Sequence, residues 1–282
     1  MSEKHLFKFQ TENDYETAKR NNLVIPNVST IVETGNTYIN TSYVDPYNGH
    51  DYVDLGLPSG TKWAKMNVGA SSETDAGLYF AWGETQGYTK SQVGTVKNFS
   101  WSDYTLTEDS GSTMSKYNST DGKTTLDFED DAVRANWGGD WHMPTNEQII
   151  ELFNETKNGF VTNAGAFTQY AWNNTNGYSS PTSTTAAISG WDTAGYFFFK
   201  NTYTSVTDAI TAEDYLFIPA AGGCGDGEVF GVGVYGCVWA SALSSENVEH
   251  AWYFYFLFDS GEAGVNGDGY RCGGQSVRPV VG

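Results

Sequence analysis

Seven consecutive large apolar or aromatic residues, at positions 252–258, run directly into a stretch of Gly, Asp, Asn and Ser. The run is far shorter than the roughly 20 apolar residues of a membrane-spanning helix, and we expect a β-strand, in which successive side chains point to opposite faces. One face would then carry Trp252, Phe254, Phe256 and Phe258. Because this face is uniformly apolar, it is predicted to lie in the core. The other would carry Tyr253, Tyr255, Leu257 and Asp259, a mixture typical of binding surfaces. The alternative, in which both faces are buried and the tyrosines reach internal partners, stays open.

The chain after residue 50 alternates short aromatic and β-branched runs with Gly, Asn, Ser and Thr. Two short strands are expected around Pro58-Ser59-Gly60, and "YLFIPAAG" indicates a buried strand. The clearest helix begins after Thr145, the predicted N-cap, with Gln148 completing a capping box. Another helix is expected to run to about residue 136 and to stop at a Gly-Gly pair. Residues 154–192 are predicted to form loops and short strands. Together these patterns predict an α+β fold with two or three helices among many short strands.

Residues 1–47 are predicted to form a separate attachment segment. Residues 11–22 indicate a short helix, and two β-like runs flank Gly35-Asn36. The segment is too small to hold a core alone, so we expect it to pack on a neighbour or on another chain. It has no apolar leader region, and no secretory signal is expected.

The acidic composition limits the classes of partner. The 282 residues carry a formal net charge of −19, which argues against nucleic acid and anionic membranes, since both need basic patches. Only 17% of the residues are charged, so Asn, Thr, Ser and Gly must cover much of the surface. Such surfaces are common in extracellular and virion proteins, and no run is long enough for membrane insertion.

The reactive side chains show no pattern of a catalytic or metal site. The chain has an odd number of cysteines, Cys224, Cys237 and Cys272, which gives no closed disulfide framework. Their spacing is also not that of a zinc site. The four histidines also lack metal spacing. An acidic group, Asp127, Glu129, Asp130 and Asp131, lacks the spacing of a calcium loop and is expected to complement the dipole of the following helix. No catalytic residue, metal or cofactor is therefore expected.

Six motifs occur in a fixed order: "YVDLGLPSGTKWAKMNVGA", "GLYFAWGET", "DDAVRANWGGDWHMPTNEQIIEL", "LFIPAAG", "VWASAL" and "QSVRPV". Together they resemble the FISUMP domains of gut Bacteroidetes, a branch of the C-type-lectin fold related to formylglycine-generating enzyme. The resemblance covers about residues 51–279 and implies a C-type-lectin-like, formylglycine-generating-enzyme-type domain over residues 48–282. One departure is His142, where the family usually has Arg.

The ending "VWASAL…AWYFYF…GYRCGGQSVRPV" resembles the variable region of proteins diversified by retroelements. In that family an error-prone reverse transcriptase rewrites adenines, mostly in AAY codons, at positions on the ligand-binding face. The resemblance implies a variable region over about residues 223–280. Its candidate ligand-binding positions are Tyr235, Cys237, Ala240, Ala242, Tyr253, Tyr255, Leu257, Asp259, Asn266, Asp268, Tyr270 and Cys272. Adenine substitution reaches all of these residue types, and the cysteines would be sampled surface residues. The interspersed Trp239, Trp252, Arg271, Gln275 and Arg278 would be fixed framework.

The N-terminal sequence resembles the leader of Bacteroides phage structural proteins. We therefore expect a ligand-binding adhesin, the receptor-binding protein of a phage tail, in the virion. Its partner would be a host cell-surface receptor, protein or glycan, with residues 1–47 attaching to other tail proteins and a homotrimer as a possible assembly. One alternative is a bacterial surface or structural domain that is not diversified. Another is an enzyme like formylglycine-generating enzyme with Cys237 and Cys272 as a pair, which is disfavoured because no histidine accompanies them in sequence.

Overall fold

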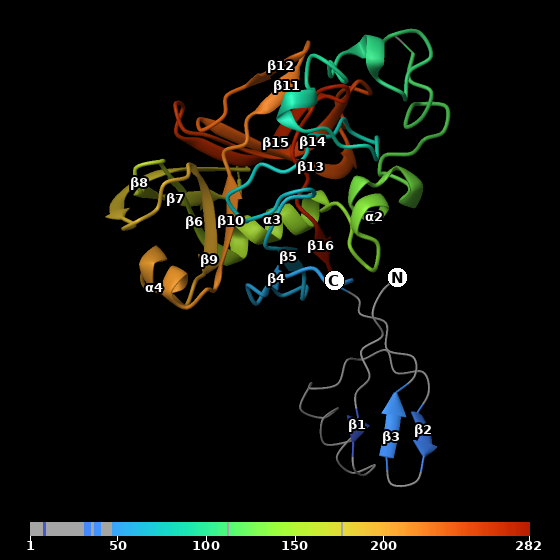
Figure 1. Ribbon diagram of the computed structural model, residues 1–282. Coiled ribbons are helices and arrows are strands. Elements are labelled where there is room, and N and C mark those ends of the chain that lie inside the picture. The colour runs from blue at the N-terminus through green and yellow to red at the C-terminus, as the bar shows by residue number, and fades with distance from the viewer. Residues whose placement is uncertain (1–7, 10–30, 35–36, 41–46, 112, 176) are drawn as a thin grey trace. The chain divides into compact units, whose positions relative to one another are not determined.

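The computed structural model describes residues 8–9, 31–34, 37–40, 47–111, 113–175 and 177–282 (Figure 1). The chain divides into two compact units, Met1–Gly49 and His50–Gly282. The strands are β1 (Lys8–Phe9), β2 (Ile31–Thr34), β3 (Thr37–Asn40), β4 (Tyr52–Val53), β5 (Lys62–Ala64), β6 (Thr156–Val161), β7 (Ala166–Asn173), β8 (Tyr178–Ala187), β9 (Gly195–Lys200), β10 (Tyr215–Pro219), β11 (Gly223–Gly225), β12 (Glu228–Phe230), β13 (Tyr235–Leu243), β14 (His250–Leu257), β15 (Glu262–Tyr270) and β16 (Val280–Val281). The helices are α2 (Ala132–Trp137), α3 (Asn146–Glu155) and α4 (Val206–Thr211), with 3-10 turns η1 (Lys90–Gln92), η2 (Trp101–Asp103) and η3 (Phe128–Asp130).

The described part of the first unit is a three-stranded antiparallel sheet in the order β1-β3-β2. Strands β2 and β3 pair from Ile31 with Asn40 to Thr34 with Thr37, so the two predicted β-like runs are confirmed. The helix predicted over residues 11–22 lies outside the described residues.

The second unit is mostly β-sheet with few helices, as expected. Its main sheet has eight antiparallel strands in the order β10-β9-β6-β7-β8-β15-β14-β13, and it curls (Figure 1). The prediction of loops and short strands over residues 154–192 is right about the presence of strands and wrong about their length, because β6, β7 and β8 have 6, 8 and 10 residues and occupy most of it. The length of these strands could not be recognised in the sequence, because Thr, Ser and Asn are frequent in them. Pairing with neighbouring strands overrides the weak intrinsic preference of such residues.

Helix α3 covers the core face of this sheet. Thr145 and Gln148 form the predicted capping box, and Phe153 is fully buried. The Phe153 ring packs against Phe198 and Phe254, with ring centroids 5.0 and 6.0 Å apart. This arrangement makes α3, β9 and β14 one hydrophobic core.

The predicted alternation of β14 is confirmed for its core face. Phe254 and Phe256 are fully buried, and the partly buried Trp252 packs against the same cluster. Phe258 is a correction: the strand ends at Leu257, and Phe258 keeps 45% of its surface exposed. It still packs against Phe160, with ring centroids 4.7 Å apart.

The two ends of the second unit meet in a small sheet of order β16-β5-β4. Strands β4 and β5 form the predicted hairpin, and Val280 of β16 pairs with Trp63 of β5. Helix α2 is shorter at its start than predicted, and it stops at Gly138, whose φ of +65° suits a glycine. Trp137 and Trp141 beside this turn are buried.

Candidate functional site

Strands β13 and β14 place three tyrosines on the side of the sheet opposite to α3. Tyr235 pairs with Leu257, and Tyr255 pairs with Cys237, so their side chains share one face. Tyr253 pairs with Trp239 on the same face, with ring centroids 5.7 Å apart. All three tyrosines are half-buried. We call Tyr235, Tyr253, Tyr255 and Leu257 the tyrosine face.

Two of these rings pack against glycines of β15. Gly267 pairs with Tyr253, and a Cβ atom on Gly267 would stand 2.2 Å from Cε2 of Tyr253 and 2.6 Å from Cδ1 of Tyr255. On Gly269, a Cβ would stand 2.9 Å from the Tyr253 ring. The rings therefore occupy the space that side chains of β15 would fill. This is why the aromatic run is followed by glycines.

The phenol groups of the tyrosine face are suited to donate hydrogen bonds. Burial raises the pKa of Tyr235, Tyr253 and Tyr255 above the ordinary value of 10.0, so all three stay protonated near neutral pH. Within the described residues, none of these hydroxyls has a hydrogen-bond partner. Each one can therefore donate to a ligand at low ordering cost, because the ring is held by packing.

Three of the predicted ligand-binding residues are buried and are corrected here. Ala240 has no exposed surface, and Cys237 and Cys272 are each 6% exposed. For Cys237 and Ala240, the reason is that the outer edge of β13 is covered by distant segments: Val238 bridges to Ser276, and Gly236 bridges to Gly222. Cys224, also expected at the surface, is 2% exposed.

Two further candidates lie on the other face of the ladder. Asp268 pairs with Trp252, and Tyr270 pairs with His250, in alternation with Tyr253. The Asp268 carboxylate accepts hydrogen bonds from Ser244 Oγ at 3.0 Å and contacts His250 Nδ1 at 3.1 Å. The remaining candidates are scattered: Ala242 is half-buried, Asp259 is exposed beyond the end of β14, and the Asn266 side chain is outside the described part.

Buried framework residues fix the loop that follows β15. The Arg271 guanidinium, which has no exposed surface, donates to Tyr104 Oη at 3.0 Å and to main-chain carbonyls, including that of Lys116 at 3.0 Å. It also lies 4.9 Å from the Trp82 ring. Trp239 and Arg278 are equally buried, consistent with the framework role that the sequence predicts for them.

A hollow of 310 Å³ lies between this loop, the β11–β12 hairpin and the η2 turn. Its lining residues are Phe99, Ser100, Trp101, Cys224, Gly225, Asp226, Phe230, Tyr270, Cys272, Gly273 and Gln275. Sequence reasoning named Tyr270 and Cys272 but missed the aromatic walls, which come from a segment without regular periodicity. One available signal was the Asp226-Gly227 dipeptide, typical of a two-residue hairpin turn. The hollow joins the tyrosine face through Phe230, whose ring centroid is 5.9 Å from that of Tyr235.

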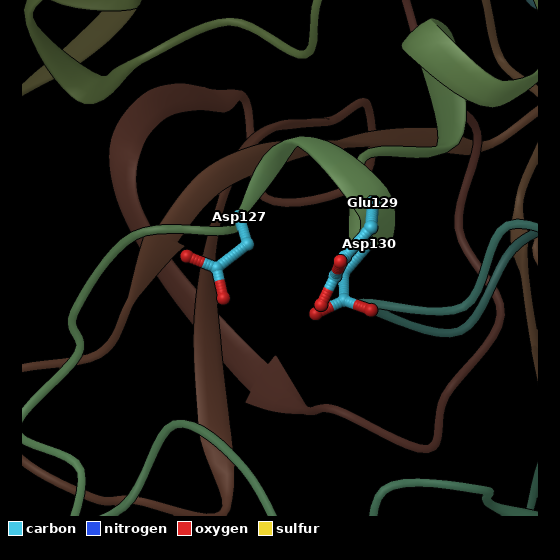
Figure 2. Close-up of side chains that lie close together, drawn as sticks. All are labelled: Asp127, Glu129 and Asp130. Carbon is cyan, nitrogen blue, oxygen red and sulfur yellow. The ribbon is translucent and has the colours of Figure 1, made fainter.

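Three acidic side chains, Asp127, Glu129 and Asp130, converge beside η3, with oxygens within 4.8 Å of one another (Figure 2). Two lysines already compensate their charge. Lys116 contacts Glu129 at 2.8 Å and also pairs with Asp130, while Lys123 pairs with Asp127 and lowers the pKa of that carboxyl. The cluster is thus an ion-pair network. Asp131 is the N-cap of α2, as the dipole interpretation requires, and accepts from the main-chain N–H of Val133.

The cysteines do not have the environment of nucleophiles. All three are free, and burial raises the pKa of Cys224 and Cys272 from 9.0 to about 12 and also raises that of Cys237. A catalytic thiol needs a lowered pKa, because the thiolate is the reactive form.

No family model, curated protein or solved structure matches the chain. Among the described residues, no helix has the length and apolar character to cross a membrane.

Proposed function

We propose that the chain is a ligand-binding protein that uses the tyrosine face. The observation that carries this proposal is the row of half-buried tyrosines that pack against glycines and whose hydroxyls have no partner among the described residues. Rigid aromatic side chains with a free polar end are what binding surfaces favour, because they bury a large area and lose little entropy. The protonated, buried thiols give no support to the enzyme alternative.

We further propose that the second unit is a C-type-lectin-like domain of the FISUMP and formylglycine-generating-enzyme type. The ordered motifs support this assignment. The second unit has a curled antiparallel sheet and few helices, and its two ends meet where β5 pairs with β16. This architecture is compatible with the assignment.

The biological setting that we propose is the tail of a Bacteroides phage, with residues 223–280 diversified by a retroelement and a host cell-surface receptor as ligand. One observation favours the alternative of a non-diversified bacterial surface domain: Cys237, Ala240 and Cys272 are buried, whereas sampled positions should face the ligand. Sequencing beside the gene decides between them. A near-identical, adenine-rich template with a reverse-transcriptase gene supports diversification, and a neighbourhood without them refutes it.

The binding proposal is tested on Bacteroides cells with fluorescently labelled full-length protein. Tyr255→Ala should weaken binding about 30-fold, the size of a hot-spot loss, and Tyr255→Phe about fivefold, the size of one hydrogen bond. The matched control is Tyr203→Phe, which removes a tyrosine hydroxyl that is bonded to Asp214 and lies outside the tyrosine face. If the Tyr255 variants bind as well as the control, the tyrosine face is not the binding surface.

A further inference from the structure

We propose that the hollow beside the tyrosine face binds a cationic side chain, a guanidinium or ammonium group, presented by a protein ligand. This inference rests on the proposed function of ligand binding and narrows the class of ligand. It identifies a second part of the site that accepts one kind of charged group.

The walls of the hollow are aromatic. The Trp101 and Tyr270 rings meet at 76° with centroids 5.7 Å apart, and Tyr270 is 55% exposed. Phe230, 47% exposed, is another lining residue. Exposed aromatic rings around a small hollow attract cations through the negative charge density on their faces.

Two residues that line the hollow each carry an acceptor that has no donor among the described residues. Oε1 of Gln275 is buried and has no hydrogen-bond partner, while its main chain is fixed by two hydrogen bonds to Phe80. The exposed Asp226 carboxylate also has no partner among the described residues. A buried acceptor without a donor costs free energy, so a ligand N–H that reaches Gln275 would gain more than an average hydrogen bond.

Asp226 is held in place by its turn. Asp226 and Gly227 have φ values of +49° and +81°, which fit a two-residue hairpin turn between Gly225 and Glu228. The Gly227 N–H donates to the Asn98 carbonyl at 2.7 Å, so the turn is tied to the wall that carries Phe99. The backbone that carries the Asp226 side chain is therefore fixed before any ligand arrives.

No lining residue supplies a positive charge. The nearby Lys97 is 4% exposed, and its ammonium is engaged by Glu84 at 2.8 Å and by the Asp103 carbonyl at 2.5 Å. The Cys224 and Cys272 thiols are neutral, because burial keeps them protonated. An anion would meet an uncompensated carboxylate here, in a chain of net charge −19. A guanidinium offers only donors, on a plane that stacks on aromatic rings, and so matches both features of the hollow.

The test uses the full ¹⁵N-labelled chain and follows the indole N–H signal of Trp101, assigned by its loss in Trp101→Phe. The probes are N-acetyl-arginine amide, its neutral isostere N-acetyl-citrulline amide, and methyl α-glucopyranoside. We expect a saturable shift with the arginine probe and binding at least about tenfold weaker with citrulline, since one charge contact is worth about 1.4 kcal/mol or more. Equal binding of arginine and citrulline, no shift with any probe, or preferential binding of the glucoside would each overturn the proposal, the last pointing to a saccharide site.

Two variants distinguish binding in the hollow from a general attraction of the probe to the negatively charged protein. Asp226→Asn should weaken the arginine probe about tenfold, and asparagine keeps the turn because it tolerates a positive φ. Asp192→Asn, the same change at an exposed residue that does not line the hollow, should leave the affinity unchanged. Equal losses in both variants would mean that only overall charge attracts the probe, and would refute the site.

The cell-binding assay tests the hollow and the tyrosine face separately. If Asp226→Asn binds cells like wild type while Tyr255→Ala does not, the tyrosine face holds and the hollow is excluded from the site. If Tyr255→Ala binds like wild type, the tyrosine face fails. The probe titration still decides whether the hollow takes a cation.

Discussion

Tyr253 and Phe254 are neighbours in sequence but belong to different parts of the molecule. The strand turns Phe254 toward α3, where it has no exposed surface, and turns Tyr253 toward the half-open opposite face. Phe254 therefore contributes stability through packing. Tyr253 keeps a hydroxyl that no described residue uses.

The two faces of β14 predict opposite effects of truncation. Phe254→Ala should lower the free energy of unfolding by about 3–5 kcal/mol, because it leaves a cavity among Phe153 and Phe198. Tyr255→Ala should cost only about 1 kcal/mol, the typical size for a point mutant outside the core. Urea denaturation of both variants measures this, and a larger loss for Tyr255→Ala would invert the assignment of faces.

The buried thiols predict a loss of stability at alkaline pH. Cys224 and Cys272 have folded-state pKa values of about 12, raised from 9.0, so both ionise first in the unfolded chain. Their contribution is complete below pH 9 and is lost as pH rises toward 12. Urea denaturation at pH 8, 9 and 10 should show a falling free energy of unfolding. The Cys224→Ser/Cys272→Ser variant should show a shallower fall, and identical slopes would contradict the assignment.

At the scale of elements, β15 is important because its glycines have no side chains facing the tyrosines. Glycine at position 267 leaves room for the Tyr253 and Tyr255 rings to pack against the strand. The β13 edge is protected in a different way, by bridges to Ser276 and Gly222, which blocks pairing with other chains along that stretch.

A methyl group at this position should displace the tyrosines. Gly267→Ala puts a Cβ 2.2 Å from the Tyr253 ring, so the ring must move. We expect a loss of about 1–3 kcal/mol of stability, as in overpacked cores, together with loss of cell binding. Gly225→Ala is the control for stability, since its Cβ would meet only Phe230 at an ordinary 3.5 Å. Thermal melting and the cell-binding assay report both effects, and unchanged binding by Gly267→Ala would show that the ring position does not matter.

Local signals in the sequence predicted local structure well. The capping box at Thr145, the hairpin around Ser59 and the alternation around Phe254 all depend on neighbouring residues, and all are confirmed. The accessibility of β13 depends on segments far away in sequence. For this reason the prediction that Ala240 faces a ligand is wrong. The walls of the hollow could not be predicted for the same reason: Trp101 and Tyr270 meet only through the fold.

At the scale of the whole molecule, the chain divides into two compact units. Each unit has its own sheets, and the hydrophobic clusters described here contain only residues of the second. The second unit also carries both the tyrosine face and the hollow.

This division predicts that residues 50–282 fold alone. The isolated fragment should melt cooperatively, within a few degrees of the same transition in the full chain, because the described core residues all lie within it. Circular dichroism of both proteins checks this prediction. An aggregated fragment, or one that melts far earlier, would contradict the division.

The pairing of β5 with β16 also constrains how the protein is made. Trp63 leaves the ribosome early, yet its strand partner Val280 follows more than 200 residues later. Contacts of such sequence separation form slowly, and until then the apolar side of β5 is open to wrong partners. The second unit therefore cannot complete its fold during translation of β6 to β15, and its nascent chain is a candidate client for chaperones throughout that interval.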